Sequence, residues 1–239
     1  MASSFSLSQA SLAAAILAST AGTYIALSPP NPSTHSQPST GDSIRWLHLT
    51  SKHTTKVVMA PVGLLAAHAS ALSFFYPNIP STLLRNGAEN GLNTSLITWS
   101  PATLLPLAGI FFAGIPLRLV PYSTLGKNFT FALKEPDRLT TTGIYRYVQH
   151  PSYTAIFLLI ICNISLLARV DGILSCWIPP QWYHAFRLLG WSIVPLGLSM
   201  MAKGLSARVR EEEVMLRDKF KLEWENWHSK TARFIPWLL

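Results

Sequence analysis

Five apolar stretches of the chain are long enough to cross a lipid bilayer. They cover residues 8–27, 57–76, 101–120, 152–169 and 186–203. A helix needs about 20 apolar residues to span the roughly 30 Å of hydrocarbon, and inside lipid it satisfies all of its backbone hydrogen bonds within one segment. The sequence therefore predicts an all-α, polytopic integral membrane protein with about five transmembrane helices.

The first of these stretches could be mistaken for a secretory signal peptide. It is rich in Ala and Ser and only moderately apolar. However, no Lys or Arg precedes its apolar part, so the basic region that begins a signal peptide is missing. We expect this stretch to be retained as the first transmembrane helix. The second stretch holds Pro61 and His68, which indicates some polar packing within it.

The basic residues are distributed unequally between the two sides of the membrane. If the chain starts outside and crosses five times, only Arg85, Arg169 and Arg187 of its 19 basic residues fall in outer loops. The positive-inside rule then places the C-terminus in the cytosol. The net charge of +8 fits a cytosolic face against anionic lipid. Nucleic-acid binding is a poor alternative, because the basic residues are scattered among membrane spans.

Outside the apolar stretches the organisation is sparse. Residues 28–40 form a linker rich in Pro, Ser and Thr. Cys162 and Cys176 lack metal-site spacing, so we expect no metal site and no disulfide framework. We predict an N-terminal membrane region over residues 1–100, with two spans and this linker. A core over residues 101–239 would hold three spans and a C-terminal cytosolic helix.

A first polar motif, TGIYRYVQHPSY, begins at Thr142 at the foot of the fourth apolar stretch. Pro151 suits the first position of a helix, where its missing N–H costs nothing. The free N–H groups that follow favour an anionic group such as a carboxylate, and His150, Tyr145 and Tyr153 add donors, acceptors and aromatic faces. A simpler interpretation is a helix cap with tyrosines at the membrane interface.

A second motif, RVREEEVML, begins at Arg208 after the fifth stretch. Two spans separate the motifs, so both lie at the same membrane face. Arg208 and Glu212 are four residues apart and share a helix face, whereas Glu213 points about 100° away. The simpler interpretation is a solvated amphipathic helix whose surface ion pair is worth under about 1 kcal/mol. Its membrane side would then consist of Val214, Leu216, Phe220, Trp224 and Trp227.

Together the two motifs resemble the isoprenylcysteine carboxyl methyltransferase family, with phospholipid methyltransferases as more distant relatives. The resemblance runs from Leu125 to Leu239 through LGKNFTF, LTTTGIYRYVQHPSY, the apolar hairpin, REEEVML and the closing KTARFIP. The chain departs from the family at Gln149, where an Arg usually precedes the His-Pro pair. This departure removes a fixed charge near the cofactor. The first hundred residues show no such likeness.

The resemblance implies S-adenosylmethionine as methyl donor, bound in a pocket at the cytosolic face. Arg208 matches the family position assigned to the substrate, and Lys134 aligns with a polar contact near the Phe129 motif. Asp137 and Arg138 align with contacting positions but differ in residue type. The remaining cofactor contacts carried over by the family motif are Leu139, Thr140, Tyr145, His150, Pro151, Ser152, Tyr153 and Glu212.

The resemblance also implies a reaction and a location. The reaction would be methyl esterification of the C-terminal prenylcysteine carboxylate of prenylated, CaaX-type proteins in the endoplasmic reticulum membrane. Two other functions stay open: a phospholipid N-methyltransferase using the same cofactor site, and a membrane scaffold without enzymatic activity. Neither the preferred prenyl length nor the oligomeric state can be derived from the sequence.

Overall fold

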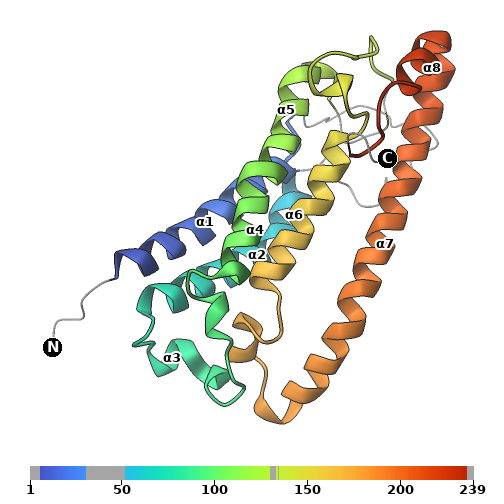
Figure 1. Ribbon diagram of the computed structural model, residues 1–239. Coiled ribbons are helices and arrows are strands. Elements are labelled where there is room, and N and C mark those ends of the chain that lie inside the picture. Colours follow the sequence, from blue (N-terminus) through green and yellow to red (C-terminus); the bar gives the residue numbers. More distant parts are fainter. Residues whose placement is uncertain (1–5, 31–51, 130–132, 134, 236–239) are drawn as a thin grey trace.

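The computed structural model describes residues 6–30, 52–129, 133 and 135–235, and most of these residues lie in helices (Figure 1). Stretches matching four of the predicted spans are long and apolar enough to cross a membrane, and α6 is a shorter apolar helix. This confirms the predicted all-α, multi-pass membrane protein. The helices are α1 (Leu7–Leu27), α2 (Lys52–Phe75), α3 (Ser81–Leu84), α4 (Pro101–Ala108), α5 (Ile115–Leu125), α6 (Pro151–Leu167), α7 (Pro180–Phe220) and α8 (Leu222–His228).

The first predicted span is part of the core of the protein. Leu12 and Ile16 of α1 are fully buried in a cluster with residues of α2, α4 and α6. Helices α1 and α2 are also joined by a hydrogen bond from the Ser70 hydroxyl of α2 to the Ala13 carbonyl of α1, at 2.9 Å. These contacts make α1 an integral element of the fold.

The third span is a composite of three helical segments. A single π-helical turn, η4 (Gly109–Gly114), joins α4 to α5. Two glycines in this turn permit close packing against α6, because a Cβ atom at Gly109 would lie 2.7 Å from Cys162 Sγ and one at Gly114 would lie 2.6 Å from Leu159 Cδ2. Small residues commonly allow such close approach between membrane helices.

Helix α7 is considerably longer than the predicted fifth span over residues 186–203. It continues to Phe220, so the span and the Arg208 motif belong to one helix. The residues after the apolar part, mainly Arg, Glu, Leu and Met, are good helix formers and do not interrupt it. Its C-cap residue, Lys221, has a positive φ of 48°. The apolar part of α7 stands beside the bundle, and its candidate membrane window is not buried by other helices (Figure 1).

One end of the bundle gathers the segments that build the site. In Figure 1 the end of α5, the start of α6 and α8 lie together at the top, whereas α3 lies at the bottom. At that lower end the Trp177 indole donates to His68 Nδ1 at 2.8 Å, and His68 Nε2 lies 2.9 Å from the carbonyl of Leu83. This confirms polar packing around His68.

Candidate functional site

The motif that begins at Thr142 forms the entry to α6. His150 is the N-cap and Pro151 is the first helical residue, as the sequence predicts. The His150 side chain makes no capping hydrogen bond to the helix, so capping does not account for its imidazole. Both residues are buried. The N-terminus of α6 therefore faces the interior of the site, where its partial positive charge can act on a ligand.

A cavity of about 420 Å³ lies beside this helix start. Its volume falls within the roughly 300–1,000 Å³ typical of small-molecule sites. Two motifs that are more than fifty residues apart in the sequence meet in its wall. The predicted site residues that line it are Leu139, Thr140, Tyr145, His150, Pro151, Ser152, Tyr153, Arg208 and Glu212. Lys134 lies outside the described residues.

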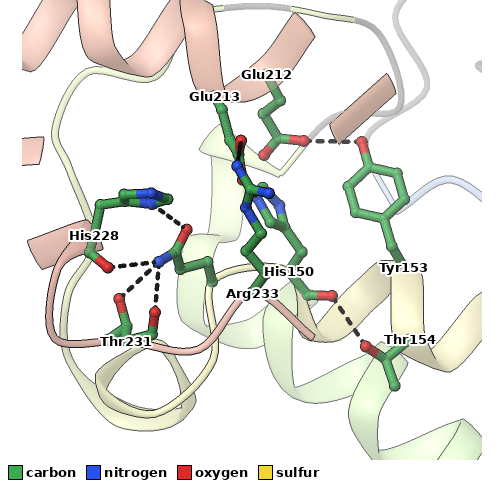
Figure 2. Close-up of polar contacts among 9 residues, drawn as sticks. His150, Tyr153, Thr154, Glu212, Glu213, His228, Thr231 and Arg233 are labelled. Atoms are coloured by element: carbon green, nitrogen blue, oxygen red, sulfur yellow. Dashed lines mark hydrogen bonds and ion pairs between the residues drawn. The ribbon is translucent and has the colours of Figure 1, made fainter. Parts of the chain in front are cut away.

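Glu212 connects α7 to α6. The Tyr153 hydroxyl donates to Glu212 Oε2 at 2.8 Å (Figure 2). Nearby, burial raises the pKa of the Tyr145 phenol well above its ordinary value, the charge of Glu212 raises it further, and the charge of Arg118 opposes both. Tyr145 is therefore a protonated donor at physiological pH. The carboxylate of Glu212 is thus positioned at the cavity wall as a hydrogen-bond acceptor.

Arg208 is buried, with only 3% of its surface exposed. Its Nη1 lies 3.6 Å from Oε2 of Glu211, three residues further along the helix. The interpretation of Arg208 and Glu212 as a solvated ion pair is therefore wrong for this fold. Leu216 and Trp224, assigned to a membrane-facing side in that interpretation, are also buried.

Glu213 lies outside the wall of the cavity that Arg208 and Glu212 line, in keeping with its predicted direction on the helix, but it is not solvent-exposed. It is buried, and its Oε1 lies 3.3 Å from His150 Nε2. Its Oε2 accepts a hydrogen bond from Arg233 Nη2 at 2.8 Å (Figure 2). Glu213 is buried because the C-terminal segment folds back over α7 and closes around that face of the helix. Glu213 thus links the histidine at the start of α6 to the end of the chain.

Gln149 holds the C-terminal strap, which we define as residues 229–235. Its Nε2 donates to the Thr231 carbonyl at 2.7 Å, to the Thr231 hydroxyl at 3.0 Å and to the His228 carbonyl at 3.2 Å. His228 Nδ1 lies 2.9 Å from Gln149 Oε1 (Figure 2). Because three oxygens fix the orientation of the amide, His228 Nδ1 carries a proton and donates.

Backbone hydrogen bonds attach the strap to the same motif. The N–H of Gln149 donates to the Ala232 carbonyl at 2.8 Å, and the N–H of His150 donates to the Arg233 carbonyl at 2.9 Å. The Thr154 hydroxyl donates to the Phe234 carbonyl at 3.1 Å. The strap therefore packs against the start of α6.

Sequence reasoning missed two parts of the cavity. Arg118 of α5 lines it, and a charged residue inside an apolar span was a usable signal, because such residues are commonly functional. The start of α2 also contributes, through Thr54, Thr55, Val58 and Met59. No motif in the first hundred residues indicated this contribution, which depends on how α2 packs.

Comparison with known proteins identifies one related family. Residues 107–187 match the family model described as the Isoprenylcysteine carboxyl methyltransferase (ICMT) family. The match includes α5, the His150 motif and α6, and it ends before Arg208 and Glu212. No curated protein sequence matches the chain significantly.

Proposed function

Because residues 107–187 match the isoprenylcysteine carboxyl methyltransferase family model, we propose that the chain methylates the C-terminal prenylcysteine carboxylate of prenylated proteins, with S-adenosylmethionine as donor. The observation that carries this proposal is the single cavity that combines the His150 motif, Arg208 and Glu212 with an apolar wall. Prenylated CaaX-type proteins would be the substrates, and the methyl ester would be the product.

The polar end of the cavity fits S-adenosylmethionine. The carboxylate of Glu212 can accept hydrogen bonds from hydroxyl or amino groups, and the N-terminus of α6 suits a carboxylate. When bound, S-adenosylmethionine supplies an electrophilic methyl group, which passes to a carboxylate oxygen as the carbon–sulfur bond breaks and its electrons go to sulfur. The protein's part is to hold the two reactants in line, which is catalysis by proximity and orientation.

No general base is needed for this reaction. A C-terminal carboxyl has a pKa of about 3.5 and is ionised at cytosolic pH. Arg208 could orient this carboxylate through the planar fork of its guanidinium. An overly tight pair would lower the nucleophilicity of the carboxylate, so we expect Arg208 to position the carboxylate without neutralising it fully.

The apolar wall suits the prenyl tail of such a substrate. It combines Ile156 and Ile160 of α6 with Met201 and Leu205 of α7, and Met59 of α2 adds to it. These residues lie on helices with apolar spans, so a lipid-like tail can remain in the bilayer while its carboxylate reaches the polar end. The charge asymmetry supports a cytosolic polar end, and family membership supports the endoplasmic reticulum as its membrane.

The direct test is transfer of a labelled methyl group. Membranes expressing the chain would be supplied with radiolabelled S-adenosylmethionine and N-acetyl-S-farnesylcysteine, with Arg208→Ala as the inactive comparison. We expect label in a base-labile methyl ester. Base-stable label in phospholipid would instead identify a phospholipid N-methyltransferase. A chain that binds no S-adenosylmethionine would be a scaffold without this activity.

A further inference from the structure

Arg118 is a buried cation in the wall of the cavity. Only 5% of its surface is exposed. Its Nε donates to the Ala26 carbonyl at 3.1 Å, and its Nη1 donates to the Ser152 hydroxyl. The guanidinium carbon lies 5.2 Å from the centre of the Tyr122 ring and 5.5 Å from that of the Phe129 ring.

The position of this charge is energetically costly. Arg118 belongs to α5, part of the third membrane span. A guanidinium inside a membrane span is unfavourable, and ionised residues there usually face a functional cavity. The hydrogen bonds and rings partly stabilise the cation. A residue kept at this cost, with its side chain lining a cavity, is a candidate for binding an anion that enters the cavity.

A second positive element meets Arg118 at the same place. Ser152, its hydrogen-bond partner, is the second residue of α6, and the N-cap side chain of His150 does not cap this helix. The N-terminus of this 17-residue helix carries a partial positive charge, although the N–H groups of His150, Tyr153 and Thr154 already donate within the protein. The guanidinium and the helix end therefore converge on one side of the cavity and form an anion subsite.

The proposed function, on which this inference rests, brings two carboxylates into the cavity. One belongs to the prenylcysteine and must remain reactive, and the other belongs to the methionine part of the cofactor and only needs to be held. Among the described residues three arginines line the cavity; Arg118 from α5 and Arg208 from α7 are buried, and Arg138 is exposed. If both buried arginines held the prenylcysteine carboxylate, they would stabilise its charge and slow its attack.

We propose that Arg118, together with the N-terminus of α6, binds the α-carboxylate of S-adenosylmethionine. Arg208 then serves the substrate carboxylate. Arg118 is assigned to the cofactor because its hydrogen bond to Ser152 attaches it to the start of α6, which also carries the predicted cofactor residues His150 and Tyr153. Tight binding at this subsite costs no reactivity, because the cofactor carboxylate takes no part in the reaction.

The test compares S-adenosylmethionine with its decarboxylated analogue. Both would be titrated onto the purified full-length chain by calorimetry. In the native protein we expect the analogue to bind roughly ten- to a hundred-fold more weakly, as for the loss of a charged hydrogen-bonding partner. Arg118→Gln should weaken S-adenosylmethionine by a similar factor and leave the analogue unchanged, so that the two affinities become nearly equal. Arg85→Gln, at an exposed position by Trp177, should keep the native ratio.

The ratio of affinities separates a specific effect from general damage, because a distorted fold weakens both ligands together. If Arg118→Gln does not fold, Arg118→Lys provides the test. An ammonium lacks the planar fork of a guanidinium, so the ratio of the affinities for the two ligands should shrink. An unchanged ratio overturns the inference. A native-like ratio in Arg118→Gln, or loss of discrimination in Arg208→Ala, would also overturn it. If the native chain binds neither ligand, the proposed function fails as well. Binding of both ligands with equal affinity by the native chain refutes the subsite alone.

Discussion

At the scale of single residues, the two motifs contribute side chains with separate tasks. Glu212 accepts from Tyr153, Arg208 is buried in the same cavity, and Glu213 faces the opposite direction toward His150 and Arg233. Neighbouring carboxylates on one helix are thus split between the ligand cavity and the C-terminal strap. Substitutions at these positions should therefore differ in kind, not only in size.

Arg208 and Glu212 should separate turnover from cofactor binding. Arg208→Ala should impair methylation of the prenylcysteine and spare S-adenosylmethionine affinity, and Arg208→Lys should fail in large part because it lacks the fork. Glu212→Ala should weaken S-adenosylmethionine itself by roughly ten- to a hundred-fold, as expected for a charged hydrogen bond. Calorimetry and the labelled-methyl assay would measure the two effects. Glu223→Gln on α8, which is exposed, is the control, and native turnover in Arg208→Ala would contradict the assignment.

Glu213 should matter mainly for stability. Glu213→Ala removes the carboxylate that faces His150 and Arg233, and leaving a buried donor without its acceptor typically costs about 1–3 kcal/mol. Glu213→Gln retains an acceptor and should cost less. Thermal unfolding of the purified variants in detergent would measure this order. A melting temperature equal to native for Glu213→Ala would show that this contact does not stabilise the fold.

At the scale of elements, the C-terminal strap and α8 fix the entry to α6. Trp227 Nε1 donates to the Tyr145 carbonyl at 2.8 Å, Trp224 stacks on His228 with ring centres 4.3 Å apart, and Gln149 binds Thr231. The final residues of the chain thus hold the motif that begins α6. In this chain Gln149 acts as a link to the strap, in addition to lining the cavity.

The link through Gln149 predicts the effect of restoring the family residue. Gln149→Arg keeps donors for the Thr231 and His228 oxygens but places a cation against the protonated Nδ1 of His228. We therefore expect Gln149→Arg to loosen the strap. Hydrogen exchange over residues 229–235 should become faster, because the free energy of opening the strap falls by about 1–3 kcal/mol. Unchanged exchange would show that the strap accommodates the charge.

The same link makes the strap sensitive to acid. Burial lowers the pKa of His228 below its ordinary value, although the charge of Glu213 opposes this. The unfolded chain therefore takes up this proton at a higher pH than the folded one. The stabilisation of the folded state by neutral His228 is complete above the pKa of the unfolded chain, about 6.5. It is lost as the pH falls through the pKa of His228 in the folded protein. His228→Asn keeps a donor near Gln149 without titrating, so its melting temperature should fall less than that of the native protein between about pH 7.5 and pH 5.5. Equal falls would rule out this source of acid sensitivity.

At the scale of the whole molecule, the helices place all parts of the cavity at one end of the bundle. The end of α1, the start of α2, the end of α5, the start of α6 and the later part of α7 each contribute lining residues. Ends and starts of successive spans therefore alternate at this face, as expected for a chain that crosses the membrane five times. The charge asymmetry predicts that this face is cytosolic.

The orientation can be measured with introduced cysteines. Cys162 and Cys176 are free and buried, so they should react little with a membrane-impermeant maleimide. In sealed microsomes Glu223→Cys should be labelled and Glu89→Cys should be protected; both positions are exposed. The opposite pattern would reverse the orientation. Asn93 stands in the glycosylation sequon Asn93-Thr94-Ser95 of an outer loop. A missing glycan there would not reverse the orientation, because Asn93 Nδ2 already donates to Asp171 and its Oδ1 accepts from Ser95.

The sequence by itself determined the membrane class, the approximate spans and the helix start at His150 and Pro151, because hydropathy and proline chemistry act locally along the chain. It also predicted that the motifs of His150 and Arg208 lie at one membrane face, because two spans separate them. Only the tertiary structure decided which side chains meet. Arg118 joins Ser152 because α5 packs against α6, and Glu213 is buried because the strap returns over α7. Helical periodicity predicts a direction for each side chain, but what lies in that direction depends on packing between segments far apart in the chain.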